Sequence, residues 1–155
     1  MRRKAKIKTT VEPDYRYGSI VVSKLINQVM RSGKKNVARK IVYDALDLAA
    51  QKTKKEPAAL LDEAIQNISP SLEVRSRRVG GANYQVPREV RPERRLALAM
   101  RWLIKATEAK KGQPTSVKLA EELVLASKNE GAAVKKKEDT HKMAEANRAF
   151  AHFAW

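Results

Sequence analysis

Residues 71–95 read SLEVRSRRVGGANYQVPREVRPERR, and this stretch decides the architecture of the chain. Two runs rich in valine, arginine and tyrosine flank the pair Gly80-Gly81, a pattern that is typical of a β-hairpin. Pro92 then fits the first turn of a helix. The sequence therefore predicts a hairpin over residues 71–91 that leads directly into a helix.

The register of this hairpin depends on the length of its turn. We expect a three-residue turn, residues 80–82, which pairs Val79 with Asn83. Since side chains alternate along a strand, one face would carry Arg75 and Arg77. The opposite face would collect the apolar side chains Leu72, Val74, Tyr84, Val86 and Val90. A slip of one residue would scatter this apolar set, which favours the three-residue turn.

Positive charge dominates both this stretch and the chain. Between Glu73 and Arg95 there are seven arginines, three glutamates and no lysine. The chain of 155 residues has 33 Lys plus Arg against 17 Asp plus Glu, a formal net charge of +16. Such an excess opposes compaction and favours a polyanionic partner, most simply nucleic acid. Arginine suits this role because its guanidinium group binds phosphate through two hydrogen bonds and stacks on bases.

Two less specific interpretations stay open. The stretch could be an ordinary surface hairpin whose charges are solvated. The charge excess could also serve an anionic membrane surface, although no helix here combines a basic face with Trp, Phe and Leu on the other. No apolar run approaches the roughly 20 residues of a membrane span. We therefore expect no membrane partner.

The rest of the chain has the apolar periodicity of helices, and its length is that of one domain. We expect a mainly α fold, a bundle of about six helices with one hairpin arm between the third and the fourth. The expected helices cover residues 19–33, 36–52, 57–68, 92–110, 115–131 and 138–150. In this interpretation Gly131 ends the fifth helix, and Lys135–Lys137 lie in the loop before the sixth.

Basic residues outside the hairpin extend the candidate binding surface. Residues 1–12 are expected to form a flexible basic arm that orders on its partner, although a merely solubilising tail is the alternative. Arg94, Arg101 and Lys105 are expected along one exposed line of a helix. The predicted nucleic-acid-binding residues are Arg2, Arg3, Lys4, Lys6, Lys8, Lys34, Lys35, Arg75, Arg77, Arg78, Gly80, Gly81, Asn83, Tyr84, Arg91, Arg94, Arg95, Arg101, Lys105, Lys135, Lys136, Lys137 and Lys142.

No pattern in the sequence indicates catalysis, so we expect no enzyme, cofactor, metal site or small-molecule substrate. The chain has no cysteine, which excludes disulfides and thiolate metal sites. His141 and His152 lack the carboxylate pattern of a metal site. The acidic pairs Glu121-Glu122 and Glu138-Asp139 are expected in exposed helical positions, which disfavours a two-metal nuclease.

Several long motifs occur in an order that is specific to one family. They are Leu25-Ile26, Gly33–Lys35, Ile41-Val42, Arg77–Pro87, Arg101–Leu103, Gly131–Lys137 and Met143–Asn147. With these motifs the sequence resembles bacterial-type small-subunit ribosomal protein seven over nearly the whole chain. The resemblance implies a helical fold with a β-ribbon arm.

The same resemblance implies a function. It implies a primary binder of 16S-type ribosomal RNA that nucleates folding of the 3′ major domain, the head of the small (30S) subunit. It also implies a place in the cytoplasmic ribosome near the subunit interface, exit-site tRNA and mRNA, beside small-subunit ribosomal proteins nine and eleven.

Two other functions compete with this one. An architectural DNA-binding protein would lay its hairpin in the minor groove with Pro87 as a wedge. Pro87 lies some way from the Gly80-Gly81 tip, which disfavours that function. An RNA-modifying enzyme is the second alternative, and the absence of any catalytic set of residues disfavours it.

Overall fold

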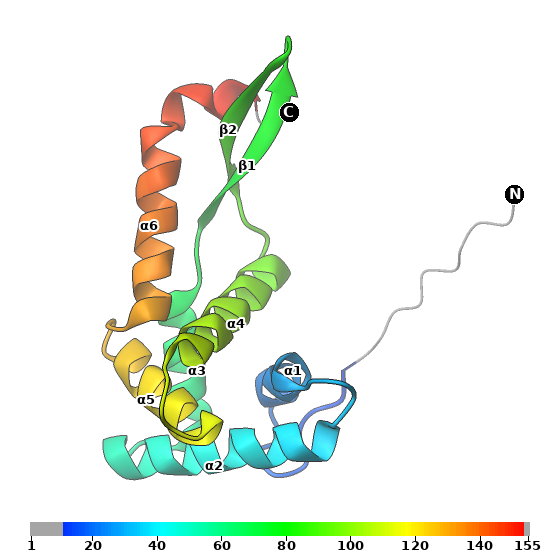
Figure 1. Cartoon of the computed structure of the whole chain (residues 1–155), viewed down its shortest axis with the longest axis vertical. Helices are drawn as coiled ribbons and strands as arrows, with labels where there is room; N and C mark the ends of the chain where they lie inside the picture. The colour runs from blue at the N-terminus through cyan, green and yellow to red at the C-terminus, as the bar shows by residue number, and fades with distance from the viewer. Residues whose placement is uncertain (1–10, 154–155) are drawn as a thin grey trace, which may run out of the picture.

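Six α-helices, one 3-10 helix and one two-stranded hairpin make up residues 11–153, the part of the chain that this computed structural model describes. Figure 1 shows the hairpin between α3 and α4. The expected mainly α class is therefore confirmed. The elements are α1 (Ile20–Val29), α2 (Lys35–Thr53), α3 (Pro57–Ile68), β1 (Leu72–Val79), β2 (Ala82–Glu89), α4 (Pro92–Ala109), α5 (Thr115–Ser127), α6 (Ala132–Ala146) and η1 (Arg148–Phe153).

Three helices, α1, α3 and α4, begin where a serine cap or a proline predicts. The Ser19 side chain accepts a hydrogen bond from the backbone N–H of Val21 at 3.2 Å, which caps α1. Pro57 and Pro92 occupy the first turns of α3 and α4, where a missing N–H costs nothing. Local sequence thus fixes these three starts.

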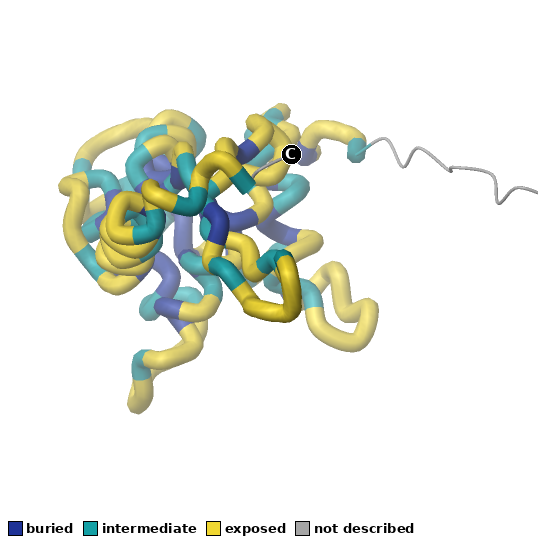
Figure 2. Tube along the Cα trace, turned by 90° about the horizontal axis from the view of Figure 1, so that it is seen from above, coloured by how far each residue is buried: buried dark blue, intermediate teal, exposed yellow. Residues whose placement is uncertain are grey.

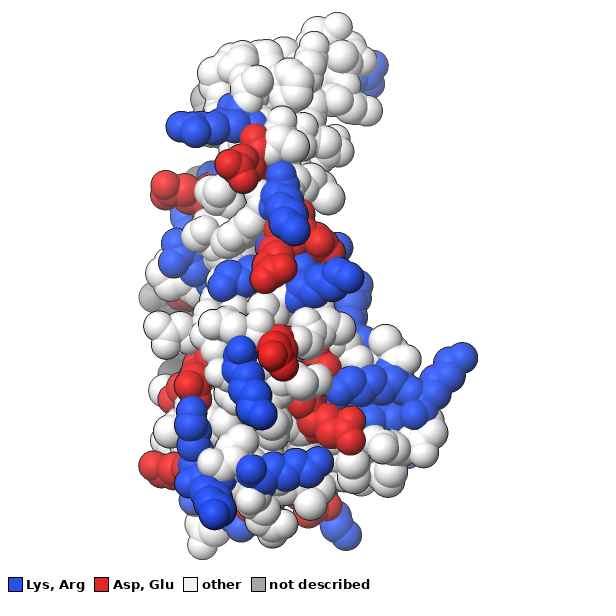
Figure 3. All heavy atoms as spheres, turned by 90° about the vertical axis from the view of Figure 1, so that its left-hand side faces the viewer, with Lys and Arg blue, Asp and Glu red and all other residues white. Residues whose placement is uncertain are grey.

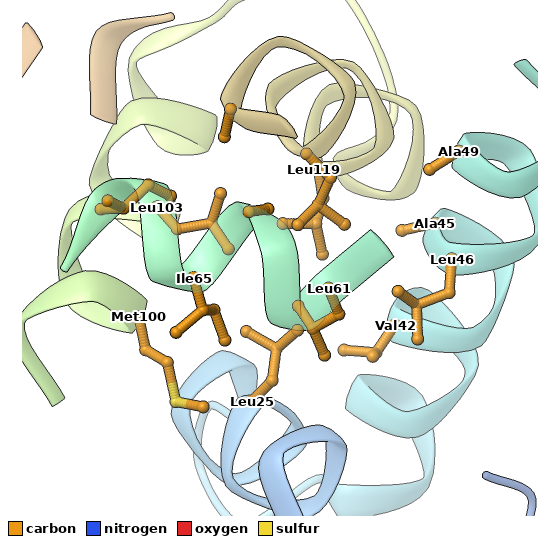
Figure 4. Close-up of a cluster of buried hydrophobic side chains, with 14 of the residues drawn as sticks. Leu25, Val42, Ala45, Leu46, Ala49, Leu61, Ile65, Met100, Leu103 and Leu119 are labelled. Atoms are coloured by element: carbon orange, nitrogen blue, oxygen red, sulfur yellow. The ribbon is translucent and has the colours of Figure 1, made fainter. Parts of the chain in front are cut away.

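The core forms where the apolar faces of the helices meet around α3. Figure 4 shows Leu61 and Ile65 of α3 lying with Leu25 of α1 and Met100 of α4. Burial of each such large side chain stabilises the fold by roughly 1.5–3 kcal/mol. Trp102 is half-buried and packs against this cluster. In the view from above, buried stretches lie inside and exposed stretches follow the outer loops (Figure 2).

The hairpin extends away from the helical body, and the C-terminal segments lie beside it (Figure 1). The Tyr84 ring lies 5.2 Å from the rings of both Phe150 and Phe153. The Arg77 guanidinium group donates a hydrogen bond to the backbone carbonyl of Phe153 at 2.7 Å. The C-terminal aromatic residues up to Phe153 therefore pack back onto the hairpin.

The expected register of the hairpin is wrong by one residue. Gly80 and Gly81 have φ of +57° and +91°, which makes them the two central residues of a two-residue turn. Val79 consequently pairs with Ala82, and Leu72 pairs with Glu89. The expected register was chosen because it collects all apolar side chains on one face of the ribbon. Other parts of the protein cover both faces, so apolar side chains occur on both and do not determine the register. Tyr84 contacts η1 from one face, while Leu72 from the other lines a groove beside α6.

The start of α6 also differs from the expectation. This helix begins at Ala132, so Lys135–Lys137 are helical and do not lie in a loop. Gly131 is the residue before the helix, with φ of +98°, and not the end of α5, which already ends at Ser127. The run Ala132–Val134 provides the first turn, because nothing in it opposes helix formation.

Glu122 is buried, which corrects the expected exposed position of the Glu121-Glu122 pair. One of its carboxylate oxygens accepts the backbone N–H of Ala133 at 3.0 Å. The other oxygen lies 3.1 Å from the ammonium group of Lys110. Glu122 therefore places a negative charge at the N-terminus of α6, where the helix dipole favours it.

No helix in the described part of the chain is both long enough and apolar enough to cross a membrane.

Candidate nucleic-acid interface

Basic side chains of the hairpin and of α4 form the first part of the candidate interface. Figure 1 shows α4 starting at the base of the hairpin, on the side away from α6. We call these residues the hairpin–α4 surface: Arg75, Arg78, Arg91, Arg94, Arg101 and Lys105. All six are exposed, as predicted for the α4 line. Among residues 11–153, only Arg75 and Arg94 of the six pair with an acid.

That acid is Glu73 of β1. The Arg75 guanidinium group donates to one carboxylate oxygen at 2.7 Å, and Nε of Arg94 donates to the other at 3.1 Å. The side chain of Glu73 is only 11% exposed, while those of Arg75 and Arg94 are 53% and 43% exposed. One buried carboxylate therefore holds an arginine of the strand and an arginine of the helix together.

Lys34 and Lys35 form a second part of the interface at the start of α2. Both side chains are exposed, and the first turn of α2 contains no acid. Two cations at a helix N-terminus oppose the helix dipole, so this arrangement disfavours the helix unless an anion binds there. Arg31, which the sequence interpretation missed, belongs to the same region and pairs with Glu108 of α4. The position of Arg31, three residues before Lys34, was the feature of the sequence that could have indicated its place in this region.

The α6 lysines lie apart from the hairpin–α4 surface. Lys135, Lys136 and Lys142 are exposed on α6, on the other flank of the molecule (Figure 1). Figure 3 shows that acidic side chains are interspersed among the basic ones on this flank. Lys137 donates to the backbone carbonyl of Asn67 at 2.8 Å and so links α6 to α3. The structure therefore does not join these lysines and the hairpin–α4 surface into one patch.

Six other predicted residues, Arg77, Gly80, Gly81, Asn83, Tyr84 and Arg95, have structural contacts or lie at the hairpin tip. Arg95 donates to the backbone carbonyl of Val90 at 2.9 Å, which supports the turn into α4. Tyr84 and Arg77 contact η1, as described above, so the Tyr84 ring is half-buried. Asn83 is exposed beside the Gly80-Gly81 turn. The predicted residues Arg2, Arg3, Lys4, Lys6 and Lys8 lie outside the described residues.

A polar network that sequence interpretation missed fixes the segment before α1. Buried Asp14 accepts the backbone N–H groups of Arg16 and Tyr17 and the hydroxyl of Tyr43. The Tyr17 hydroxyl donates to Asp47 at 2.9 Å. Burial, with help from this bond, raises the pKa of Tyr17 to about 12. Tyr17 therefore packs against α2 rather than being free to stack on a base.

Comparison with known proteins identifies the family. The family model described as ribosomal protein S7p/S5e matches residues 1–148. Small ribosomal subunit protein uS7 of Thermotoga maritima is 56% identical over 155 residues, which cover all of both chains. The chain belongs to the uS7 family. The uS7 proteins of Thermosipho melanesiensis and of Chelativorans sp. are 58% and 55% identical over 154 residues, 99% of each chain.

Membership of the uS7 family confirms the resemblance found in the sequence. The chain is a ribosomal protein of the small subunit, a structural constituent of the ribosome and not an enzyme. Its place in the cytoplasmic ribosome follows from the same membership. The hairpin–α4 surface therefore belongs to a protein that works inside a ribonucleoprotein particle.

Arg101→Ala is expected to weaken specific and non-specific RNA binding by about the same factor. Arg101 is exposed on α4 without an acidic partner in residues 11–153, so we expect it to contact the RNA backbone, which positions the protein without reading bases. The slope of log affinity against log salt concentration should become shallower by about one, as expected for the loss of one phosphate contact. Filter binding of specific and random RNA measures both effects.

Lys52→Ala, in the last turn of α2 and outside the predicted residues, is the matched control and should change neither binding. Loss of discrimination by Arg101→Ala with unchanged non-specific affinity would contradict the backbone assignment.

Proposed function

We propose that this protein binds 16S-type ribosomal RNA directly, as a primary binder that nucleates folding of the 3′ major domain of the small subunit. The proposed location is near the subunit interface, exit-site tRNA and mRNA, beside small-subunit proteins nine and eleven. Family membership supports the ribosomal setting, and the chemistry of the exposed surface supports direct RNA binding.

The hairpin–α4 surface carries this proposal. Arg78, Arg91, Arg101 and Lys105 are exposed and make no ion pair with any acid in residues 11–153. Exposed cations that no acid neutralises leave the attraction of a polyanion uncompensated. A hairpin rich in arginine can also follow the irregular shape of folded RNA, which proteins recognise by shape, phosphates and unstacked bases.

Competition separates this function from DNA binding. A complex of the protein with labelled 3′ major domain RNA is challenged with unlabelled ribosomal RNA or with duplex DNA of equal phosphate content. We expect ribosomal RNA to displace the label at much lower concentration. Equal competition by duplex DNA would favour an architectural DNA-binding protein instead.

Binding is expected to depend strongly on salt. If residues 1–8, Lys34, Lys35 and the hairpin–α4 surface neutralise about six to ten phosphates, affinity should fall by roughly 1,000-fold or more between 50 and 200 mM salt. Titrations at several concentrations of monovalent salt give the slope. A nearly flat dependence would contradict an electrostatic interface.

A further inference from the structure

We infer that Glu73, an acid, promotes RNA binding by positioning Arg75 and Arg94 as one phosphate-binding pair. This inference rests on the proposed RNA-binding function. It assigns a role to a residue whose charge has the same sign as the RNA and which simple electrostatics would count as unfavourable.

The geometry of Glu73 is that of a bridge between two elements. Both Nε and Nη2 of Arg75 lie 2.7 Å from one carboxylate oxygen, and Nε of Arg94 lies 3.1 Å from the other. Arg75 stands two residues further along β1, while Arg94 lies in the first turn of α4. Each carboxylate oxygen thus orients one guanidinium group, and the pair spans the junction between hairpin and helix.

The exposure of the three side chains shows which groups remain for a ligand. Glu73 is nearly covered, whereas both arginines are about half exposed. A guanidinium group has five N–H donors, and Glu73 engages at most two on Arg75 and one on Arg94. The remaining donors can bind phosphate oxygens, for which the planar guanidinium group is well suited.

Holding the two arginines before binding favours association in two ways. Two guanidinium groups close together repel each other, and the carboxylate between them offsets that repulsion. The bonds to Glu73 also restrict two long side chains, so less conformational entropy is lost when RNA binds. The group of Glu73, Arg75 and Arg94 still attracts the RNA, because two cations and one anion leave a net positive charge.

The test compares two substitutions that change the net charge equally. Glu73→Gln removes the carboxylate of the bridge. Glu89→Gln is the matched control, because Glu89 is exposed on β2 and has no side-chain partner within residues 11–153. With 3′ major domain RNA as the probe, Glu73→Gln should weaken binding by about fivefold to tenfold. Glu89→Gln should leave binding unchanged or strengthen it, since it removes a repulsive charge.

A double-mutant cycle distinguishes positioning from a purely structural role. In a protein that already carries Arg75→Ala and Arg94→Ala, Glu73→Gln should no longer weaken binding and should slightly strengthen it. If Glu73→Gln does not fold, Glu73→Asp replaces it, because the shorter side chain keeps the charge but cannot reach both arginines.

The outcomes separate this inference from the function on which it rests. Failure of the unaltered protein to bind the RNA would overturn the proposed function and, with it, the role of Glu73. Normal binding by the unaltered protein together with equal or tighter binding by Glu73→Gln would overturn the positioning role alone. The same weakening by Glu73→Gln in both backgrounds would show that Glu73 only supports the fold.

Discussion

Replacement of residues 76–86 by a short glycine-rich turn is expected to weaken RNA binding by roughly ten- to a hundredfold. The replacement removes Arg77 and Arg78, and each lost charge-assisted hydrogen bond contributes about 1.5–3 kcal/mol. A tenfold change in affinity corresponds to about 1.4 kcal/mol, so even partial loss of these contacts reaches the lower figure. Binding to 3′ major domain RNA measures the effect.

The helical body should survive this replacement. Val86 is the one buried side chain among the residues that are removed, and the core around α3 does not include it. Helical circular dichroism and the melting temperature of the body should therefore change little. Unfolding of the body would show that the hairpin is a structural element and not an RNA-binding arm.

A control separates the loss of hairpin arginines from the loss of aromatic packing. The replacement also removes Tyr84 and uncovers Phe150 and Phe153. The double variant Phe150→Ala and Phe153→Ala disturbs the same cluster but keeps every hairpin side chain. We expect this variant to bind RNA nearly normally. Equal weakening by the two variants would mean that the C-terminal packing, and not the arginines, supports binding.

Gly131→Ala is expected to destabilise the protein by about 2.5–6 kcal/mol. An alanine Cβ at this position would lie 2.8 Å from the Glu122 carboxylate and 3.2 Å from Cβ of Leu125. The backbone of Gly131, with φ of +98° and ψ of 169°, lies in a region that essentially only glycine adopts, and it adds about 1–3 kcal/mol of strain for a residue with a side chain. Displacing Glu122 from the start of α6 would cost roughly another 1.5–3 kcal/mol, because a buried charged group would lose its partner. Urea denaturation measures the free energy of unfolding.

Gly112→Ala is a control that introduces backbone strain without a close contact of the new Cβ. Gly112 also has a positive φ, +82°, but no atom lies within 4 Å of the position that its Cβ would take. This substitution should therefore cost only about 1–2 kcal/mol. Equal destabilisation by the two substitutions would show that Glu122 is not held against Gly131.

The helices were predictable because their signals are local. Ser19, Pro57 and Pro92 each act on the first turn that follows them, and the apolar residues of each helix recur within that helix. Exposure of Arg101 and Lys105 follows from the same periodicity. For such features the sequence and the structure agree, since no distant partner is needed.

The apolar pattern of the hairpin gave the wrong register, although the Gly80-Gly81 pair is itself a local signal of a two-residue turn. Its apolar residues contact different partners, with Tyr84 on the aromatic rings of η1 and Leu72 beside α6. Both partners lie some 70 residues away in the chain. The hydrogen bonds between Lys137 and Asn67 and between Arg77 and Phe153 join residues that are similarly far apart in the sequence. A rule that places all apolar side chains on one face fails when two distant segments cover two faces.

The buried acids Glu73 and Glu122 also depend on distant partners. Glu73 has one partner nearby, Arg75, but its second partner, Arg94, lies 21 residues further on. Glu122 did carry a local signal, because it lies three residues after Leu119 and four before Ala126, both buried. Its partner groups on Lys110 and Ala133 belong to neighbouring elements and decide whether that burial is tolerated.

Chemical footprinting of the protein on intact 16S-type ribosomal RNA tests the proposed function most directly. The RNA is probed with and without the protein, and protected nucleotides are mapped along the whole molecule. The proposed function predicts protection confined to the 3′ major domain, weakened by the replacement of residues 76–86 and by Glu73→Gln but not by Glu89→Gln. Protection spread over all domains, or no protection at all, would contradict it.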